Sequence, residues 1–397
     1  MEDGTGAAIG SDTGYFSGQE ADLETFAALT ARQLDAADVP QAREIKSNIP
    51  IYDMNVLGPA LLDPVSRRSV MAEWAACLRD GAGVLVLAGA YSDVEIIDRA
   101  TVAFEEIIAD EKAGSGGGAD HFAAAGANDR IWNALQKLGM RDPDTFVRYH
   151  SNITVDAACE AWLGPGYQMT AQVNLVRPGG AAQQPHRDYH LGFMTSERAA
   201  EYPAHIHDLS PALTLQGAIA HCDMPIESGP TRLLPFSQLF RAGYLAFVRD
   251  DFRAHFDAHA VQLPLSKGDA VFFNPALYHG AGENRSAGIQ RMANLLQISS
   301  PMGRAMEAVD REALSARVFP ALLTARSEGD LSEAEVSAAI AATAEGYSFP
   351  TNLDTDPPVG GLAPRTQAEV LRDAVAEGWS ARELLDALAE QSARRRA

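Results

Sequence analysis

The sequence predicts an α+β protein in which a mainly β core lies between helical segments. Between about residues 165 and 300, short β-type runs alternate with Pro/Gly turns, whereas helical periodicity precedes this region and returns after Pro301. Several short strands at this spacing are typical of a sandwich or barrel. The runs are YQMTAQVNLV, LTLQGAIAHCDM, TRLLP, AVQLPL, DAVFF and RMANLLQIS.

Three parts are expected along the 397 residues. Residues 1–45 form an acidic, partly mobile N-terminal segment, since its start is rich in Gly, Ser and Thr. Residues 46–300 form the main domain, with the β core at about 165–300, and residues 301–397 form a helical extension. The hydrophobic fraction of 46% and charged fraction of 21% are ordinary for a soluble globular protein.

Charge and composition exclude several classes of partner. The net charge of −21 argues against nucleic acid, whose binding requires clustered Lys and Arg, and against an anionic membrane surface. No run approaches the length of a membrane span, and no signal-peptide pattern is visible at the N-terminus. The three cysteines form no CxxC motif, which favours free thiols in a reducing compartment. We therefore expect a cytoplasmic protein that acts on a small molecule.

The segment before the core begins with an amphipathic helix from Asp63 that ends at Gly81. A buried strand follows at 84–89, and SDVE at 92–95 predicts a capping box in which Ser92 starts a second helix. The apolar face of the first helix comprises Val70, Met71, Trp74, Cys77 and Leu78.

A Gly/Ala-rich loop at 112–129 is long for a connection inside a compact domain, which indicates a functional or mobile segment. The overlapping segment 120–137 is therefore a candidate lid. Arg130 and Trp132 are its candidate substrate contacts, although the amphipathic run around Trp132 also fits a core position.

After the core, helices are expected at 305–325, 332–345 and 364–394, with an extended stretch between the last two. Within that stretch, residues 348–354 are a candidate to close over the mouth of the core. The helical faces are expected to pack on the core or on a second copy, which allows a homo-oligomer. Their apolar residues include Val370, Leu371, Val375, Leu384, Leu385 and Leu388.

The stretch PHRDYHLGF contains the strongest metal-binding pattern. In a strand, residues i and i+2 point to the same side, so His186 and Asp188 project together. The best third ligand is His279, in GDAVFFNPALYHGAG. Two histidines and one carboxylate leave three open positions, which is the pattern of non-haem Fe(II) oxygenases, whereas zinc sites close more tightly and favour Cys and His.

Two other clusters compete with this one. HIHD at 205–208 lies between two prolines and is expected to be an exposed loop. HCD at 221–223 lies in a strand-like run and is the stronger rival. His190 is expected to support the site or lie at the surface rather than bind the metal.

Four stretches together resemble the phytanoyl-CoA dioxygenase family of Fe(II)/2-oxoglutarate-dependent oxygenases. They are HRD at 186–188, DMPIESGPTRLLPFSQ at 223–238, GDAVFFNPALYHGAGEN at 268–284 and QRMANLLQIS at 290–299. In this resemblance HCD occupies the start of the Gly-Pro loop, which favours His186 as the ligand. Two residues depart from the family pattern: Gln238 stands where a His is frequent, and Phe236 where a Gly is frequent.

The resemblance implies a double-stranded β-helix (jelly roll, cupin-like) that binds Fe(II), 2-oxoglutarate and O2. It also implies an Arg after the distal His that binds the distal carboxylate of 2-oxoglutarate, because a guanidinium donates two parallel hydrogen bonds to a carboxylate. Arg291 is the candidate, and Arg285, inside a turn, is expected to be solvated. In this resemblance, related halogenases lack the carboxylate, so Asp188 favours hydroxylation, desaturation or another oxidation over halogenation.

Further candidates lie on either side of the metal motif. Gln172 and Asn174, on the preceding strand, are candidates for 2-oxoglutarate or substrate binding, with a structural role equally possible. Tyr189, His190 and Phe193 are candidate substrate residues. The predicted function is hydroxylation of a small organic molecule. The alternatives are a non-catalytic jelly-roll binding protein and a cupin-like Zn or Mn isomerase or hydrolase.

Overall fold

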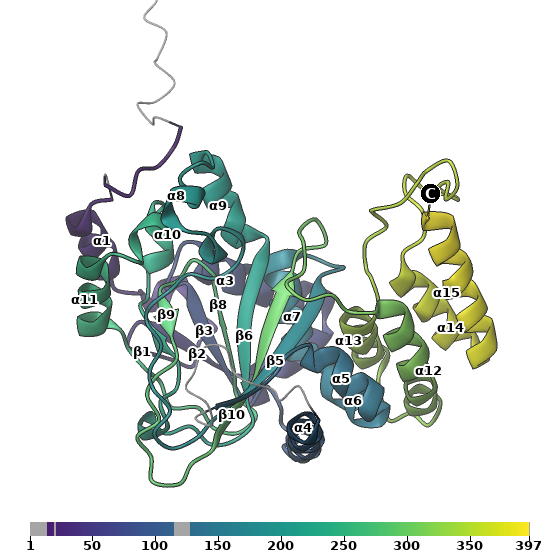
Figure 1. Cartoon of the computed structure of the whole chain (residues 1–397). Coiled ribbons are helices and arrows are strands. Elements are labelled where there is room, and N and C mark those ends of the chain that lie inside the picture. Colours follow the sequence, from purple (N-terminus) through teal and green to yellow (C-terminus); the bar gives the residue numbers. More distant parts are fainter. Residues whose placement is uncertain (1–13, 20, 115–127, 397) are drawn as a thin grey trace, which may run out of the picture.

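The computed structural model describes residues 14–19, 21–114 and 128–396, and its centre is a large mixed β-sheet (Figure 1). The eight strands lie in the order β1-β2-β3-β8-β6-β10-β5-β4, and every neighbouring pair is antiparallel except β2 and β3. In that order they are Glu44–Lys46, Ile49–Asp53, Val84–Ala88, Ala270–Phe273, Thr214–Ala220, Arg291–Ser299, Gln168–Val176 and Asn128–Ile131.

The two faces of this sheet differ in composition, because alternate residues of each strand point to opposite sides. On β5, one set of alternate residues joins the main hydrophobic core and contacts helices; we call this side the helical face. The other set includes Thr170, Gln172 and Asn174, and we call that side the site face. The β5 residues on the helical face are Met169, Ala171, Val173 and Leu175.

Five helices of eight or more residues, between β2 and β5 in the chain, contribute side chains to the main hydrophobic core on the helical face. In the first, Asp63 caps the N-terminus by accepting a hydrogen bond from the backbone of Ser66. The predicted capping box at 92–95 is wrong, since α4 begins at Glu95, whose backbone N–H donates to Asp93 instead. The five are α3 (Pro64–Arg79), α4 (Glu95–Ala113), α5 (Ala134–Arg141), α6 (Pro143–His150) and α7 (Ile153–Leu163).

A second, two-stranded sheet lies toward the site face. It pairs β7 (Arg232–Leu233) with β9 (His279–Gly280). The predicted strand at 260–265 contributes only isolated bridges, from Val261 and Leu265. The predicted α+β class with a mainly β core is thus confirmed, but the strands of the described residues form two separate sheets rather than one closed barrel. The short helices on this side are α1 (Leu23–Thr30), α8 (Ser196–Ala199), α9 (Ala204–Ala212), α10 (Gly243–Ala246) and α11 (Asp250–His259).

The candidate lid at 120–137 is only partly described. Its residues 120–127 lie outside the described residues. The remainder forms β4, the edge strand of the large sheet, and the start of α5, so the described half is part of the fold rather than a free loop.

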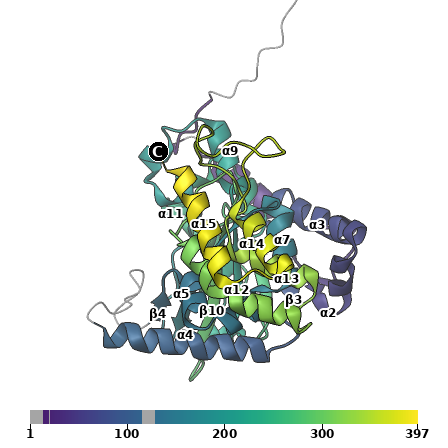
Figure 2. The same cartoon turned by 90° about the vertical axis from the view of Figure 1, so that its right-hand side faces the viewer.

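The C-terminal extension forms four helices at one end of the molecule (Figures 1 and 2). The predicted helix at 364–394 is two helices, because Gly378 ends α14 in the left-handed conformation with φ 69°. Of the six apolar residues predicted for these faces, Leu385 is exposed and the others are buried in the chain's own core. The helices are α12 (Arg311–Ser327), α13 (Glu333–Thr343), α14 (Gln367–Glu377) and α15 (Ala381–Arg395).

Residues 348–354 do not close over the site face. Asn352 donates to the backbone carbonyl of Arg395, and Ser348 donates to that of Pro364. Figure 1 shows this stretch beside α15, at the opposite end of the molecule from β9. None of the described helices is long and apolar enough to cross a membrane.

Candidate metal centre

The structure brings the three predicted ligands together on the site face. His186 and His279 pair through reciprocal backbone hydrogen bonds of 3.0 and 3.2 Å, which places their rings 4.4 Å apart between centroids. The Nε2 atoms of His186 and His279 lie 3.8 and 3.4 Å from Oδ2 of Asp188. Among the described residues, no other group of three or more His, Cys, Asp and Glu side chains converges in this way.

Both imidazoles are oriented for metal binding. Nδ1 of His186 lies 2.9 Å from the carbonyl oxygen of Gln184, and Nδ1 of His279 lies 2.9 Å from that of Leu277. A carbonyl only accepts, so each Nδ1 carries the proton and each Nε2 keeps its lone pair. Backbone partners that fix the ring in this tautomer are typical of histidines that bind metals.

Asp188 is held as a carboxylate. Its Oδ2, the oxygen closest to both histidines, also accepts a hydrogen bond from Nε2 of Gln216 on β6. Burial opposes ionisation, but His186, His279 and this amide outweigh it and hold the pKa of Asp188 below its usual range. Burial also lowers the pKa of His186, which favours the neutral ring that a metal requires. The donor set of two neutral nitrogens and one carboxylate therefore fits a divalent iron ion.

Arg187 anchors the segment that carries two of these residues. Because it lies between them in an extended segment, its side chain points away from the cluster into the protein, where it is fully buried. Its Nη2 donates to the carbonyls of Ser237 and Phe240 at 2.6 and 2.8 Å. Gly243 leaves room for the guanidinium, since a Cβ there would lie 2.0 Å from its central carbon.

The Gly-Pro loop packs beside the end of β9. Gly229, with φ 74°, lies so close to the chain that a Cβ would meet the carbonyl of Glu283 at 2.3 Å. Nη1 of Arg291 joins both segments by donating to the carbonyls of Ser228 at 3.1 Å and Gly282 at 3.3 Å. Among the described residues, Nε and Nη2 of Arg291 have no hydrogen-bond partner. These two nitrogens of the buried guanidinium therefore remain available as donors to a ligand. Burial lowers the pKa of Arg291 to about 10.

Arg285 is exposed, as expected. The HIHD cluster is not the predicted loop, because it lies in α9, where His207 is buried and its Nε2 lies 3.0 Å from the carbonyl of Ala199. The HCD cluster does not join the metal centre, because His221 lies on the helical face, opposite the site face. Its two ring nitrogens each lie 2.8 Å from a hydroxyl oxygen, of Thr101 and of Tyr149. Burial lowers the pKa of His221 to about 3.

Gln172 and Arg130 belong to a chain of polar side chains beside the cluster. Nη1 of Arg130 donates to Oε1 of Gln172 at 2.9 Å, and Nε2 of Gln172 donates to Gln297 at 3.3 Å. The guanidinium of Arg130 lies 5.3 Å from the ring centre of Trp132. Asn174 faces the same side, and its buried Oδ1 has no hydrogen-bond partner in the described part of the chain. These residues lie on the site face, where a role in ligand binding stays a prediction.

The residues after the metal motif form a tight turn. Tyr189 and His190 both have positive φ, of 63° and 47°, and Tyr189 is 3% exposed. Phe193 is 57% exposed, and its ring packs edge-on against that of Tyr189 at 5.8 Å between centroids. His190 has a half-buried side chain whose Nε2 has no partner among the described residues.

Sequence reasoning missed two residues of this region, Gln216 and Glu307. Gln216 alternates with apolar residues on a predicted strand, a pattern that could have placed it on the same face as Gln172. Glu307 lies in the connection between β10 and α12, where its position gives no such signal.

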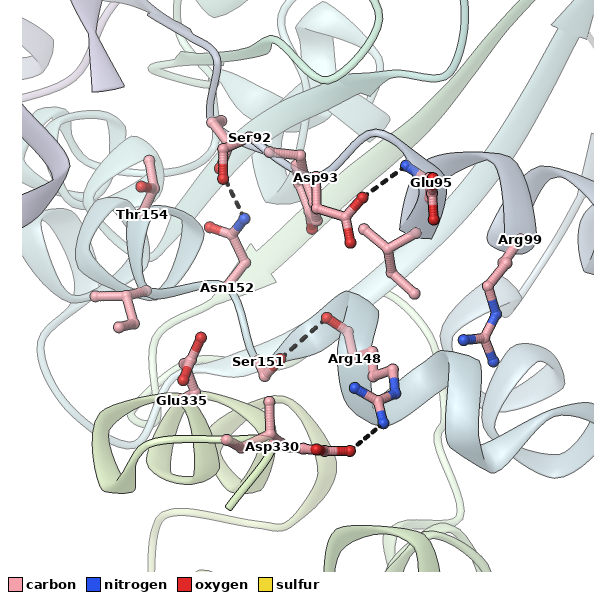
Figure 3. A pocket seen from close by; sticks show the side chains of 15 residues that line it. Ser92, Asp93, Glu95, Arg99, Arg148, Ser151, Asn152, Thr154, Asp330 and Glu335 are labelled. Atoms are coloured by element: carbon pink, nitrogen blue, oxygen red, sulfur yellow. Dashed lines mark hydrogen bonds and ion pairs between the residues drawn. The ribbon is translucent and has the colours of Figure 1, made fainter. Parts of the chain in front are cut away.

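A separate cavity of about 480 Å³ lies between α4, α6, α7 and the C-terminal helices (Figure 3). It is lined by exposed polar groups such as Arg148, which pairs with Asp330. It contains none of the predicted site residues, so this cavity is distinct from the candidate centre.

The sequence motifs around this centre match a known family. The family model described as "Phytanoyl-CoA dioxygenase (PhyH)" matches residues 80–293, more than half of the 397-residue chain. The chain belongs to the phytanoyl-CoA dioxygenase (PhyH) family. This family consists of non-haem iron- and 2-oxoglutarate-dependent enzymes, and the match includes His186, Asp188, His279 and Arg291.

Two curated relatives are dioxygenases. Dioxygenase trt7 of Aspergillus terreus is 29% identical over 143 residues, which cover 36% of this chain and 44% of trt7. Dioxygenase andF of Emericella variicolor is 27% identical over 139 residues, 34% of this chain and 43% of andF. The chain thus spans less than half the length of the curated relatives it matches.

A solved structure, the "non-heme alpha ketoglutarate dependent epimerase SnoN from nogalamycin biosynthesis", is 19% identical, with 60% of this chain and 85% of that chain covered and a TM-score of 0.41. An identity and a TM-score this low leave the reaction of this PhyH-family chain open.

Proposed function

We propose that this PhyH-family member is an Fe(II)/2-oxoglutarate-dependent dioxygenase that hydroxylates an unactivated C–H bond of a small organic molecule. The observation that carries the proposal is the convergence of His186, Asp188 and His279, with both Nε2 atoms directed at one carboxylate oxygen. In this proposal these three residues hold the iron, and the sheets form the jelly roll of the family.

The exposure of the three side chains gives the centre a closed side and an open side. The side chain of His279 is 6% exposed, that of Asp188 17% and that of His186 28%. These three residues would therefore hold iron with protein covering the His279 side, and 2-oxoglutarate and O2 would reach it from the more exposed His186 side. When bound, iron and 2-oxoglutarate would activate O2, the oxidant: one oxygen atom would enter succinate as CO2 leaves, and the other would enter the hydroxylated product.

The chain's own residues orient the reactants. Gln216 fixes the carboxylate of Asp188, and the buried Arg187 fixes the backbone on which both ligands of the HRD motif lie. Nε and Nη2 of Arg291 are the donors proposed for the distal carboxylate of 2-oxoglutarate. Substrate would approach from the side of His186, near Arg130 and Tyr189.

The test is anaerobic addition of Fe(II) and then 2-oxoglutarate to the metal-free full chain. Chelation of 2-oxoglutarate to Fe(II) gives a weak visible charge-transfer band, which His279→Ala should lose. His205→Ala is the matched control, because His205 lies exposed on α9. A folded, metal-loaded chain without the band contradicts the proposal and favours another metal or a binding role.

A further inference from the structure

The connection between β10 and α12 (residues 300–310) lies beyond the family match, which ends at residue 293. Two of its side chains nevertheless reach the site face. The sulfur of Met306 lies 3.7 Å from Nε2 of Gln172, and Oε1 of Glu307 lies 3.5 Å from the same nitrogen. The connection therefore adds to the site face a part that the family model does not cover.

Hydrogen bonds hold this connection along β5. Nε2 of Gln168, at the start of the strand, donates to the carbonyl of Ser300 at 2.7 Å. Further along, Oε1 of Glu307 accepts from the backbone N–H of Asn133 at 2.7 Å. Gln168 and Gln172 are alternate residues of β5 and point to the same side of the sheet. The connection therefore lies on the site face, beside the strand.

A row of glutamines joins the connection to the candidate metal centre. Gln216 donates to Asp188 and is the register partner of Gln297 on β10. Gln297 in turn accepts a hydrogen bond from Gln172 on β5 at 3.3 Å. Neighbouring strands lie about 4.8 Å apart, so β5 is about 10 Å from β6. A small organic molecule can span this distance between Asp188 and the connection.

Both ends of this row present a buried acceptor that has no hydrogen-bond partner among the described residues. At one end it is Oε1 of Gln216, whose amide is oriented by its bond to Asp188. At the other end it is Oε2 of Glu307. Buried polar atoms are nearly always satisfied, so the two acceptors require donors from a bound molecule or water. The row therefore suits a ligand that carries hydrogen-bond donors.

We propose that residues 300–310 form one wall of the substrate cavity and that Met306 and Glu307 select the substrate. Met306 is flexible and apolar, so it suits the hydrocarbon body of a ligand. The carboxylate of Glu307 only accepts, so it favours a hydroxyl or ammonium group and disfavours a second carboxylate. This inference rests on the proposed function and deepens it: the substrate is an apolar molecule that carries a hydroxyl or amino group.

The first experiment locates the connection relative to the metal. The methionine methyl groups of the full chain are isotope-labelled for NMR, and the Met306 signal is assigned from its loss in Met306→Leu. Paramagnetic Mn(II) then takes the place of iron. The Met306 signal should broaden more than that of Met71, which lies on α3 and packs against the core of the helical face. Broadening of Met71 as strong as that of Met306 would overturn the proposal.

The second experiment measures selection with three matched probes: cyclohexanol, cyclohexylamine and cyclohexanecarboxylate. Each is titrated into the labelled chain with Zn(II) and 2-oxoglutarate, and the shift of the Met306 signal gives its affinity. The alcohol and the amine should bind at least about tenfold more tightly than the carboxylate. The preference should fall below about threefold in Glu307→Gln. Glu328→Gln, at an exposed position at the end of α12, is the matched control and should keep it.

Three outcomes of the titrations would overturn the proposal: no probe shifts the Met306 signal, the carboxylate binds most tightly, or Glu307→Gln keeps the full preference. The charge-transfer band is recorded on the iron-loaded chain. If the band is absent and Mn(II) broadens neither methyl signal, but the probes show the preference, the oxygenase proposal fails and the wall stands. If the band is present without the preference, the wall fails and the oxygenase proposal stands.

Discussion

The two faces of the large sheet use neighbouring residues of the same strands for different purposes. On β10, Leu296 faces the helices and joins the main core, whereas Gln297, the next residue, faces the other side and contacts Gln172. On β6, Gln216 contacts Asp188, whereas His221, just beyond the strand, contacts the helices. The glutamines of these strands thus converge on the site face, which also buries a second hydrophobic cluster that includes Val86, Val271 and Phe273.

Position in the strand, rather than residue type, thus determines whether a buried polar side chain is used within the fold or stays available for a ligand. His221 and His279 are both buried, yet His221 uses both ring nitrogens within the protein and His279 keeps Nε2 for Asp188. Substitutions on the helical face should therefore affect folding, and substitutions on the site face should affect ligand binding.

The largest effect is expected for the carboxylate of the metal cluster. Asp188→Ala removes one of the three proposed ligands. Loss of a residue that only hydrogen-bonds to a ligand weakens metal binding by up to about 100-fold, so loss of the ligand itself should weaken iron binding by more than that and abolish turnover. Iron content after dialysis and the charge-transfer band measure this effect.

Asp223→Ala is the matched control, since Asp223 is exposed and accepts a hydrogen bond from the backbone of Lys267. If Asp223→Ala lost iron and Asp188→Ala kept it, the HCD cluster would be the metal site and the assignment of the faces would be wrong.

The next effect concerns the helical face. Leu296→Ala leaves a cavity in the main core and should lower the free energy of unfolding by about 2–5 kcal/mol. Gln297→Ala removes one hydrogen bond to Gln172 and should cost only about 1 kcal/mol. Denaturant titration of both variants measures the contrast, and equal losses would show that the two faces are not energetically distinct.

Much of this contrast could be predicted from the sequence. The long strands at 168–176 and 291–299 and the helix from Pro64 follow from periodicity, because many apolar residues repeat at one spacing. The proximity of His186 and Asp188 follows from the period of a strand. His279 could be named only as the best candidate for the third ligand, because a contact between distant residues depends on tertiary structure.

The remainder depends on tertiary packing. β7 and β9 have two residues each, too few to show a period. HIHD was expected to be a loop because of its flanking prolines, yet Pro203 precedes α9 and Pro211 lies in its last turn, where the helix tolerates it. Glu307 reaches the site through an irregular connection, so only the path of the folded chain places it there.

The pH dependence of stability tests whether His221, the buried histidine on the helical face, stays neutral in the folded chain. The pKa of His221 is about 3 in the folded chain, below its ordinary 6.5, so the unfolded chain binds more protons between these values and stability falls as the pH falls through that window. Between pH 7.5 and 5 His221 should account for a loss of about 2 kcal/mol.

His221→Gln should remove this part of the pH dependence, while His150, whose pKa burial lowers to about 3, keeps its own. Asp156 acts in the opposite sense, because burial raises its pKa to about 6 and its contribution to stability grows as the pH falls. The comparison of unfolding free energies is therefore made between the wild-type chain and His221→Gln at each pH. If the two curves of unfolding free energy against pH ran parallel, the pKa of His221 would be the same in the folded and unfolded chain.

The last comparison concerns two arginines near the edge of the site face. Arg291 is buried, with two of its nitrogens unpartnered among the described residues, and Arg285 is exposed in the preceding turn. Arg291→Ala should raise the Kd for 2-oxoglutarate at least about 30-fold, equivalent to about 2 kcal/mol, because it removes a buried partner of a carboxylate. Arg285→Ala should change it less than about twofold, since exposed ion pairs contribute little. Titration of the charge-transfer band gives both constants.

Arg291→Lys should recover only part of the loss, because an ammonium cannot reproduce the two parallel hydrogen bonds of the guanidinium. If Arg285→Ala were the damaging change, the strand register that places Arg291 beside Ser228 and Gly282 would be wrong at this end of β10.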